Sequence, residues 1–281
     1  MSFIAIIGSG ALGGALAHKL AGRDRIREVR LIDVEERIAQ GKALDIQQSG
    51  PVESFSTRLT FAGSINAAAG ADVVVLADGA ASSAEHAGEA GLAILRQLAA
   101  IESAAPIVCA GATARELIAR AVTQLRIPQS RVLGSAPSAL ESALRALAGL
   151  ALDGSGTEVS LRVVGVPPTS AVVAWEEATA FGQPLGSLLP PHEIGALARR
   201  IPGLWPPGPY ALASAAARVV EAIAHGSRRR FSCFVTVSRG RVAAMPVELS
   251  QDGVRQVFEP ALTRQERTLM ENAMENAREK P

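Results

Sequence analysis

The chain has 281 residues, of which 48% are apolar and 20% charged, and its formal net charge is +1. This composition predicts an ordered protein with one large or two medium-sized domains and excludes a disordered chain. A nearly neutral chain provides no overall field that attracts nucleic acid or an anionic membrane, so we expect neither as a partner. Cys109 and Cys233 lie in apolar runs and are expected to be buried thiols in a reducing compartment.

The N-terminal residues begin a strand-like apolar pattern directly, without the basic segment and cleavage site of a signal peptide. The sequence also has no run of about 18 or more apolar residues, the length that a transmembrane helix requires. We therefore expect a cytoplasmic protein without a membrane span. No metal site is predicted.

Strand and helix patterns alternate through the first half of the chain. The apolar runs predict strands at residues 3–7, 29–32, 73–76, 107–109 and 131–133, and helices at 12–20, 38–47, 90–103 and 117–125. Short, entirely apolar strands between helices are typical of a parallel sheet that is covered on both faces. The first half is therefore predicted to be an α/β domain with a doubly wound parallel sheet.

The second half has a different pattern. It predicts antiparallel strands at 158–166, 170–175, 231–237 and 241–247, the last two flanking residues 238–240, an amphipathic helix at 210–224, and a charged helix at 263–278. Residues 202–209 contain four prolines and are expected to form a structured loop. We place the division between the two domains at residues 1–137 and 138–281, with an α+β fold for the second.

The turn after the first strand has the glycine pattern G-x-G-x-x-G, from Gly8 to Gly13. In this pattern the first glycine permits a tight turn, the second lets the backbone approach a pyrophosphate, and the third packs the helix closely on the strand. The second strand ends at Asp33, 20 residues after Gly13, where a carboxylate accepts hydrogen bonds from a ribose of NAD. The predicted cofactor contacts are Gly8, Ser9, Gly10, Ala11, Leu12, Gly13 and Asp33, together with Ala77 and Gly79 after the next strand.

Several further stretches carry a more specific pattern. The sequence reads LID at 31–33, GKALDIQQ at 41–48, ADVVV at 71–75, RVLGS at 131–135, LESA at 140–143, MPV at 245–247 and EPALT at 259–263. These motifs resemble the lactate/malate dehydrogenase family along essentially the whole chain. The resemblance implies an N-terminal Rossmann domain that binds NAD, an α+β substrate-type domain, and a homodimer or homotetramer.

The catalytic residues of that family are missing from the matching positions. The resemblance implies a hydride transfer between nicotinamide and a 2-hydroxy acid, which requires a histidine as acid and base. Pro167 stands at the position of that histidine, and Glu141 at that of its partner aspartate. Leu144 takes the place of the arginine that binds the substrate carboxylate, and the neighbouring Arg145 would point about 100° away from it on a helix.

Four further positions depart from the family. The loop of residues 80–88 contains no arginine, and Ser82 and Gly88 stand where the family has two. Ala110 replaces an asparagine after the fourth predicted strand. Asp78 replaces a small residue and brings a negative charge close to the expected cofactor.

Only His86 and Glu141 remain as candidate catalytic groups. His86 lies in the loop that would close over a substrate, although a solvated histidine is the simpler interpretation. Glu141 is interpreted as a relic whose carboxylate is satisfied by hydrogen bonds. The triplet Arg228–Arg230 is interpreted as a solvated corner, and Trp205 as a core residue or a cap on the cleft.

Three functions remain open. The leading hypothesis is an NAD-binding relative of the lactate and malate dehydrogenases without 2-hydroxy acid dehydrogenase activity, which then acts as a cofactor-responsive binding or assembly protein. The second is an NAD-dependent oxidoreductase for a less charged substrate, with an apolar pocket that includes Leu144, Pro167 and Trp205. The third is a structural homo-oligomer that binds no nucleotide, which is favoured if Asp78 points into the pyrophosphate site.

Overall fold

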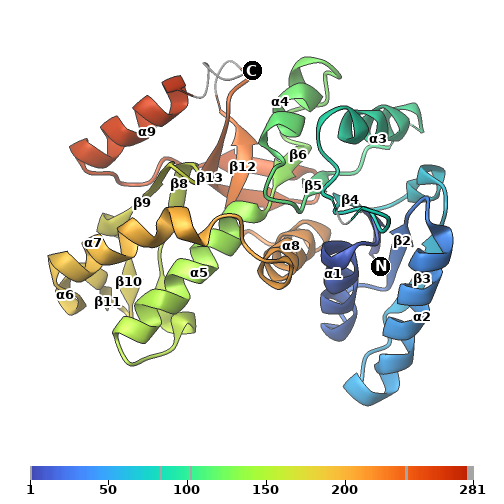
Figure 1. Cartoon of the computed structure of the whole chain (residues 1–281), viewed down its shortest axis with the longest axis horizontal. Helices are drawn as coiled ribbons and strands as arrows, with labels where there is room; N and C mark the ends of the chain where they lie inside the picture. Colours follow the sequence, from blue (N-terminus) through green and yellow to red (C-terminus); the bar gives the residue numbers. More distant parts are fainter. Residues whose placement is uncertain (1, 83, 102, 238–239, 277–281) are drawn as a thin grey trace.

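A long mixed sheet runs through both halves of the computed structural model, which describes residues 2–82, 84–101, 103–237 and 240–276 (Figure 1). In the N-terminal half its strands are parallel and follow the order β3-β2-β1-β4-β5-β6. Their bounds are β1 Phe3–Ile7, β2 Glu28–Ile32, β3 Arg58–Ala62, β4 Val73–Leu76, β5 Ile107–Cys109 and β6 Val132–Gly134. This order reverses direction between β1 and β4, and ligands of doubly wound sheets bind beside the carboxyl ends of the strands at such a point.

The same sheet continues into the second half through antiparallel strands. Phe234 in β12 lies opposite Gly134 in β6, and the order goes on as β12-β13-β8-β9, with β14 paired to β13. These strands are β8 Val163–Val166, β9 Ser170–Val173, β12 Arg230–Thr236, β13 Val242–Ser250 and β14 Gly253–Val257. A separate small sheet is made by β7 Val159–Ser160, β10 Thr179–Ala180 and β11 Gln183–Pro184.

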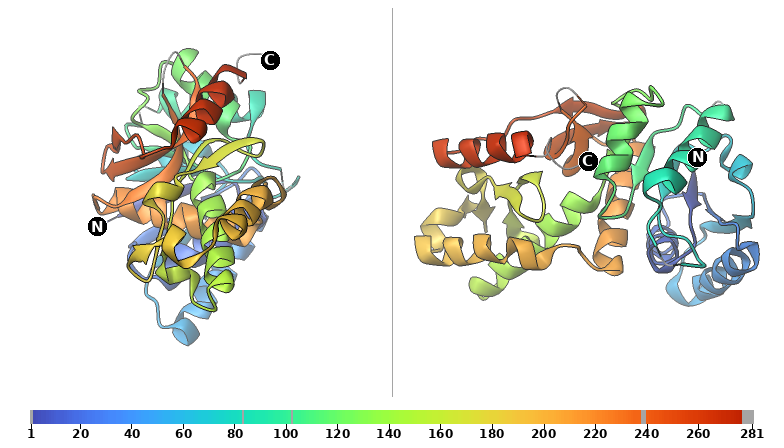
Figure 2. Two further views of the ribbon diagram at one scale, coloured as in Figure 1. Left: turned by 90° about the vertical axis from the view of Figure 1, so that its left-hand side faces the viewer. Right: turned by 45° about the horizontal axis from the view of Figure 1, so that its top comes forward.

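Helices cover the parallel strands on both sides, as the strand pattern predicts. In Figure 2, α1 (Ala11–Gly22) and α2 (Glu36–Glu53) lie on one side of these strands, and α3 (Gly88–Ala100) and α4 (Arg115–Thr123) on the other. The central helices are α5 (Ala136–Ala151) and α8 (Pro209–Ala224), and α8 packs against α1. The remaining helices are α6 Leu185–Leu188, α7 Pro191–Arg200 and α9 Arg264–Asn276, with short 3-10 turns η1 Ile65–Ala68, η2 Gly156–Glu158, η3 Trp175–Glu177 and η4 Ile201–Leu204.

Two apolar clusters form the core. The larger one is built from the parallel strands and also takes in α8, β12 and β13, so elements of the second half share the core of the first. The smaller one surrounds α5, where Leu140 and Leu144 are fully buried against β7, β8 and α7. The ring of Trp205 touches both clusters and stands edge-on to Phe234, with ring centroids 5.8 Å apart. Trp205 is therefore a core residue.

The α/β fold with a Rossmann-type parallel sheet is confirmed, and so are most of the predicted elements. The strand β3 was missed because its sequence alternates only weakly between buried and exposed positions at the edge of the sheet. The strand predicted over 158–166 is wrong in extent, since it is divided into η2, β7 and β8. The division into domains at 137/138 stays a prediction.

Four parts of the sequence predictions include residues outside the described ranges. These residues are Ser83 in the loop of residues 80–88, Glu102 in the helix predicted at 90–103, Ser238 and Arg239 in the turn before β13, and Ala277 and Arg278 in the predicted terminal helix. None of the helices in the described ranges is long and apolar enough to cross a bilayer.

Phe234 provides a test of the shared core, because its side chain is fully buried where β12 meets β6. We expect Phe234→Ala to lower the free energy of unfolding by about 3–5 kcal/mol through lost burial and a cavity. The same change at Phe61, which is 39% exposed on β3, should cost less than half as much. Denaturant unfolding of both variants measures the difference, and equal losses would contradict the shared core.

Candidate functional site

The glycine-rich turn joins β1 to α1 at the carboxyl edge of the parallel sheet. Gly8 has φ +104°, a conformation that residues with a side chain rarely adopt. A Cβ at Gly13 would overlap the carbonyl oxygen of Gly8, and a Cβ at Gly10 would overlap the carboxyl group of Asp78. The amino group of Lys42 in α2 donates to the carbonyl oxygens of Ser9 and Gly10, at 2.5 and 2.6 Å. The motif predicts that a ligand approaches the backbone of this turn closely. At Gly10 the group that does so is the carboxyl group of Asp78, a side chain of the same protein.

Asp33 lies at the end of β2, as predicted, and its carboxylate is only 6% exposed. Its Oδ2 accepts from the backbone N–H of Ser9 at 2.8 Å and of Ala80 at 3.0 Å, and its Oδ1 accepts from that of Glu35 at 3.0 Å. Burial opposes ionisation, but these N–H donors outweigh it and hold the pKa of Asp33 below its ordinary value. The carboxylate is ionised and already fully engaged with backbone donors.

Asp78 occupies the N-terminus of α1. Its Oδ2 accepts from the N–H of Leu12 at 3.0 Å and its Oδ1 from the N–H of Gly13 at 2.8 Å. Its own carbonyl oxygen accepts from the N–H of Gly10 at 2.9 Å, and the residue is 4% exposed. The first N–H groups of a helix and the helix dipole favour an anion, which is why such a terminus binds pyrophosphate in dinucleotide folds. Here the anion is the carboxylate of Asp78.

The segment after Asp78 folds back on itself along the same sheet edge. Gly79 donates to the carbonyl of Ala84 at 3.0 Å, and Asp78 and Glu85 form an antiparallel bridge. The carboxylate of Glu85 then accepts from the N–H groups of Ala112 and Thr113, at 2.7 and 2.8 Å, in the turn after β5. Residues 78–85 therefore span the cleft from the glycine-rich turn to the β5–α4 turn.

His86 closes this segment and is partly buried rather than solvated, so the solvated interpretation is wrong. Its N–H donates to the carbonyl of Ala77, and its ring lies close to Gly8 and Gly79. Burial lowers the pKa of the imidazole, although the charges of Asp33 and Asp78 act in the opposite direction. His86 faces the cleft, between the two carboxylates.

Glu141 is used in a structural network. It is 6% exposed on α5, its Oε1 accepts from Arg162 at 2.7 Å, and its Oε2 accepts from the hydroxyl of Ser232 in β12. Burial raises the pKa of Glu141, and the charge of Arg162 only partly offsets this. The carboxyl group lines an open groove of about 1020 Å³ between α5 and α8, and His86 is not among the described residues that line it. The two candidate catalytic groups therefore do not share a pocket there, and the structure supports the interpretation of Glu141 as a satisfied relic.

The family's catalytic positions have become packing positions. Pro167 is buried in the turn that joins β8 to β9, and Leu144 is fully buried in the cluster around α5. Arg145 donates to the carbonyl oxygen of Val159 at 2.6 Å, so it holds β7 and does not replace the missing arginine. The hydroxyl of Ser82 accepts from the N–H of Ala84 at 3.3 Å, within the loop itself. Gly88, at the other arginine position, begins α3.

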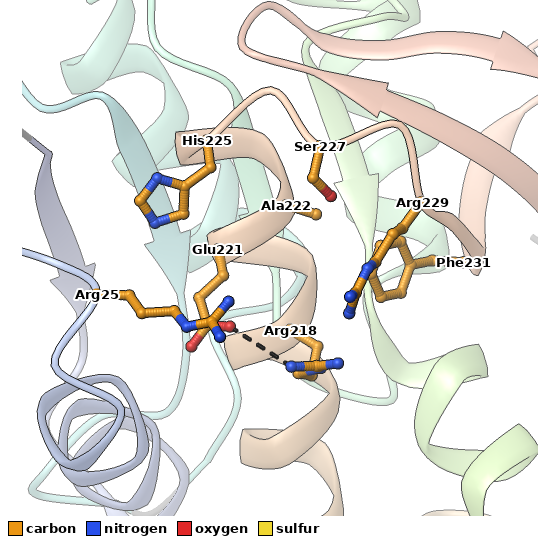
Figure 3. Close-up of a pocket in the computed structure, with 8 residues that line it drawn as sticks. All are labelled: Arg25, Arg218, Glu221, Ala222, His225, Ser227, Arg229 and Phe231. Atoms are coloured by element: carbon orange, nitrogen blue, oxygen red, sulfur yellow. Dashed lines mark ion pairs between the residues drawn. The ribbon is translucent and has the colours of Figure 1, made fainter.

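A second pocket, of about 360 Å³, lies at the far end of α8 (Figure 3). Figure 3 shows the side chains of Arg25, Arg218 and Arg229 directed around that of Glu221, which is 5% exposed. Glu221 pairs with Arg218 and, at 3.2 Å, with Arg23 at the end of α1. The ion pair of Glu221 with Arg23 thus ties α8 to α1, and Arg218 adds a second pair within α8.

All three arginines of the triplet 228–230 are exposed, as the interpretation of a solvated corner predicts. Arg229 lines the pocket of Figure 3, and the guanidinium of Arg230 stacks over the ring of Phe258 at 3.8 Å. No group of three or more histidine, cysteine, aspartate or glutamate side chains that would hold a metal occurs in the described part of the chain.

Comparisons with known proteins agree with the fold. Residues 3–104 match the family described as lactate/malate dehydrogenase, NAD binding domain. The malate dehydrogenase of Thermomicrobium roseum is 28% identical over 98% of this chain and 96% of its own, and that of Pelodictyon phaeoclathratiforme is 29% identical over 94% and 92%.

Solved structures give the same result. The malate dehydrogenase of Salinibacter ruber superposes with a TM-score of 0.89 at 23% identity, covering 98% of this chain and 95% of that one. The lactate dehydrogenase of Cryptosporidium parvum, solved with lactic acid and NAD, gives a TM-score of 0.84 at 23% identity, covering 99% and 96%.

These matches define the class of the protein. The chain has an NAD-binding domain of the Rossmann type within a lactate/malate dehydrogenase-like fold. Residues 3–104 match the NAD-binding domain of the lactate/malate dehydrogenases, and malate dehydrogenases of 28% and 29% identity align over 98% and 94% of this chain, which supports a lactate/malate dehydrogenase-like protein. The cofactor of this domain class is NAD, as the sequence predicts.

The residues of the cleft fit NAD only in part. The glycine-rich turn and Asp33 have the expected positions, and Ala77 and Gly79 lie beside them at the end of β4. However, the N–H groups of Leu12 and Gly13 that would face a pyrophosphate are bound to Asp78. In this structure, Asp78 accepts from the N–H groups expected to bind the pyrophosphate. Asp33, the expected acceptor for the ribose, accepts from backbone N–H groups of the protein.

The raised pKa of Glu141 leads to a prediction for stability against pH. A carboxyl group with a raised folded-state pKa stabilises the protein fully below its ordinary value of 4.5 and loses that contribution as pH rises through the folded-state pKa. We therefore expect the free energy of unfolding of the wild type, minus that of Glu141→Gln, to decrease as pH rises above 4.5. Denaturant unfolding at several pH values measures this difference, and an increase with pH would contradict the assignment.

Proposed function

We propose that this protein is a lactate/malate dehydrogenase-like protein that has lost 2-hydroxy acid dehydrogenase activity. The observation that carries the proposal is the position of Leu144, which is fully buried in the apolar cluster around α5. An arginine at that place would bind the substrate carboxylate, whereas a buried leucine offers no charge and no accessible surface to a 2-hydroxy acid.

The acid–base chemistry is missing at a second, independent place. Pro167 supplies no group that accepts or donates a proton, and its turn is enclosed between β8 and β9. The loop of residues 80–88 contributes no arginine, and its one acidic side chain, Glu85, is bound to backbone N–H groups. Base, carboxylate clamp and loop cation are therefore all absent from the positions that the family uses.

The alternative of an oxidoreductase for a less charged substrate receives less support. That hypothesis needs Leu144, Pro167 and Trp205 to line an apolar pocket. Leu144 is 0% exposed and Trp205 packs between the two core clusters, so both are occupied by packing.

The remaining features are part of the same proposal. We infer a cytoplasmic protein that forms a homodimer or homotetramer and responds to a small-molecule ligand. The oligomer is inferred from the resemblance to the family, and the relatives that align along the chain are named as malate dehydrogenases.

Turnover with purified protein tests the proposal. We expect no NADH formation from NAD with malate or lactate, under conditions in which a malate dehydrogenase control gives a clear rise in absorbance at the nicotinamide band. Turnover by the wild type at even about one-thousandth of the control would mean that a catalytic base is present and that the proposal is wrong.

Restoring a single residue tests whether the loss of dehydrogenase activity results from changes at several positions. We expect Pro167→His to remain inactive, because Leu144 still fails to bind the substrate carboxylate. Val166→His, one residue away in β8, is the matched control for the effect of adding an imidazole. Malate oxidation by Pro167→His, but not by Val166→His, would show that the missing base alone accounts for the loss.

A further inference from the structure

Asp78, Ala80 and Glu85 bond along the carboxyl edge of the parallel sheet, where doubly wound folds bind a dinucleotide. Three carboxylates lie along the carboxyl edge of the sheet, and each accepts from backbone N–H groups. The donors to Asp78 lie in α1, those to Asp33 in the turns after β1 and β4, and those to Glu85 in the turn after β5. The N–H donors at this edge are the groups that hold a dinucleotide in doubly wound folds.

We propose that residues 78–82, 84 and 85 form an internal plug, in which the carboxylate of Asp78 takes the place of a pyrophosphate and keeps NAD out of the cleft. The plug competes with NAD for the same donors, so NAD binds only when the segment leaves the cleft. The proposal concerns binding and does not depend on the proposed loss of turnover.

The competition has a steric and an electrostatic part. The carboxyl group of Asp78 lies against Gly10, on the side where the motif leaves room for a pyrophosphate, as the overlap with a Cβ at Gly10 demonstrates. A pyrophosphate carries two negative charges and would lie beside the carboxyl group of Asp78, a residue that is only 4% exposed. Like charges at such a site repel strongly because little water screens them.

The plug is held at both ends, which makes it a defined structure. At one end Asp78 also accepts through its carbonyl from Gly10, and at the other Glu85 bonds to Ala112 and Thr113. Between them, Ala80 donates to Asp33, so the predicted ribose-binding carboxylate is itself a contact of the plug. Removal of one anchor therefore loosens the whole segment.

Calorimetric titration of NAD and NADH into the full-length protein tests the proposal. We expect Asp78→Ala to bind NAD at least about tenfold more tightly than the wild type, since it frees the N–H groups of Leu12 and Gly13. The matched control is Asp72→Ala, since Asp72 also accepts a backbone hydrogen bond, from Phe3, but at the opposite end of β4. The control should bind as the wild type does. Equal affinity of Asp78→Ala and wild type, or tight binding by the wild type, would overturn the plug.

Two further measurements keep the test decisive if the alanine variant fails to fold. Asp78→Asn preserves the shape of the side chain but removes its charge, and we expect a smaller increase in NAD affinity. In the wild type, saturating NAD should speed amide hydrogen exchange at Gly79 and His86, whose N–H groups bond within and beside the plug. Unchanged or slower exchange at these amides with NAD bound would overturn the proposal.

Turnover assays on the same variant separate the two proposals. An Asp78→Ala variant that binds NAD without oxidising malate or lactate supports both. If it binds NAD and does oxidise them, the plug is supported and the loss of the active site is wrong. If Asp78→Ala binds no better than the wild type and neither turns over, the plug is wrong while the proposed function stands.

Discussion

The N–H groups at the start of α1 must bind an acceptor, and the identity of that acceptor determines what the N-terminal domain does. The first donors of a helix have no partner within it, and leaving them buried and unpaired would cost free energy. In a dinucleotide-binding protein a pyrophosphate satisfies them. Here Leu12 and Gly13 donate to Asp78, which completes the helix terminus without a cofactor.

This single interaction organises the rest of the cleft. Because Asp78 is held on α1, the chain that follows β4 turns back toward Asp33 and reaches the β5–α4 turn through Glu85. His86 is thereby drawn into the cleft, where burial lowers its pKa. The loop that the resemblance places over a substrate instead contacts the nucleotide edge of the sheet, through Ala80 and Glu85.

At the positions that the resemblance assigns to substrate binding and catalysis, side chains pack in the interior of the protein. Leu144 belongs to the apolar cluster around α5, and Pro167 fixes the turn between β8 and β9. Glu141 pairs with Arg162 and Ser232 and links α5 to β12. An arginine introduced at position 144 would bury a charge among apolar side chains, so the old chemistry now conflicts with the core.

Much of the fold could be predicted from the sequence because it depends on local patterns. Apolar runs separated by amphipathic helices specify the parallel sheet, and the glycine spacing from Gly8 to Gly13 specifies the turn into α1. The same reasoning predicted that Pro167 and Leu144 replace catalytic residues of the family, from motifs nearby in the chain, and this assignment stays a prediction. The edge strand β3 escaped it because an edge position imposes only a weak burial pattern.

The occupant of the cleft was decided only by the tertiary structure. The sequence identified Asp78 as an unusual charge near the cofactor, but its side chain binds α1 residues 65 and 66 positions away. Likewise, the partners of Glu85 and Glu141 lie on elements that local sequence does not bring together. Hydrogen bonds between distant segments depend on how the sheet places its strand ends side by side, and no local pattern encodes that placement.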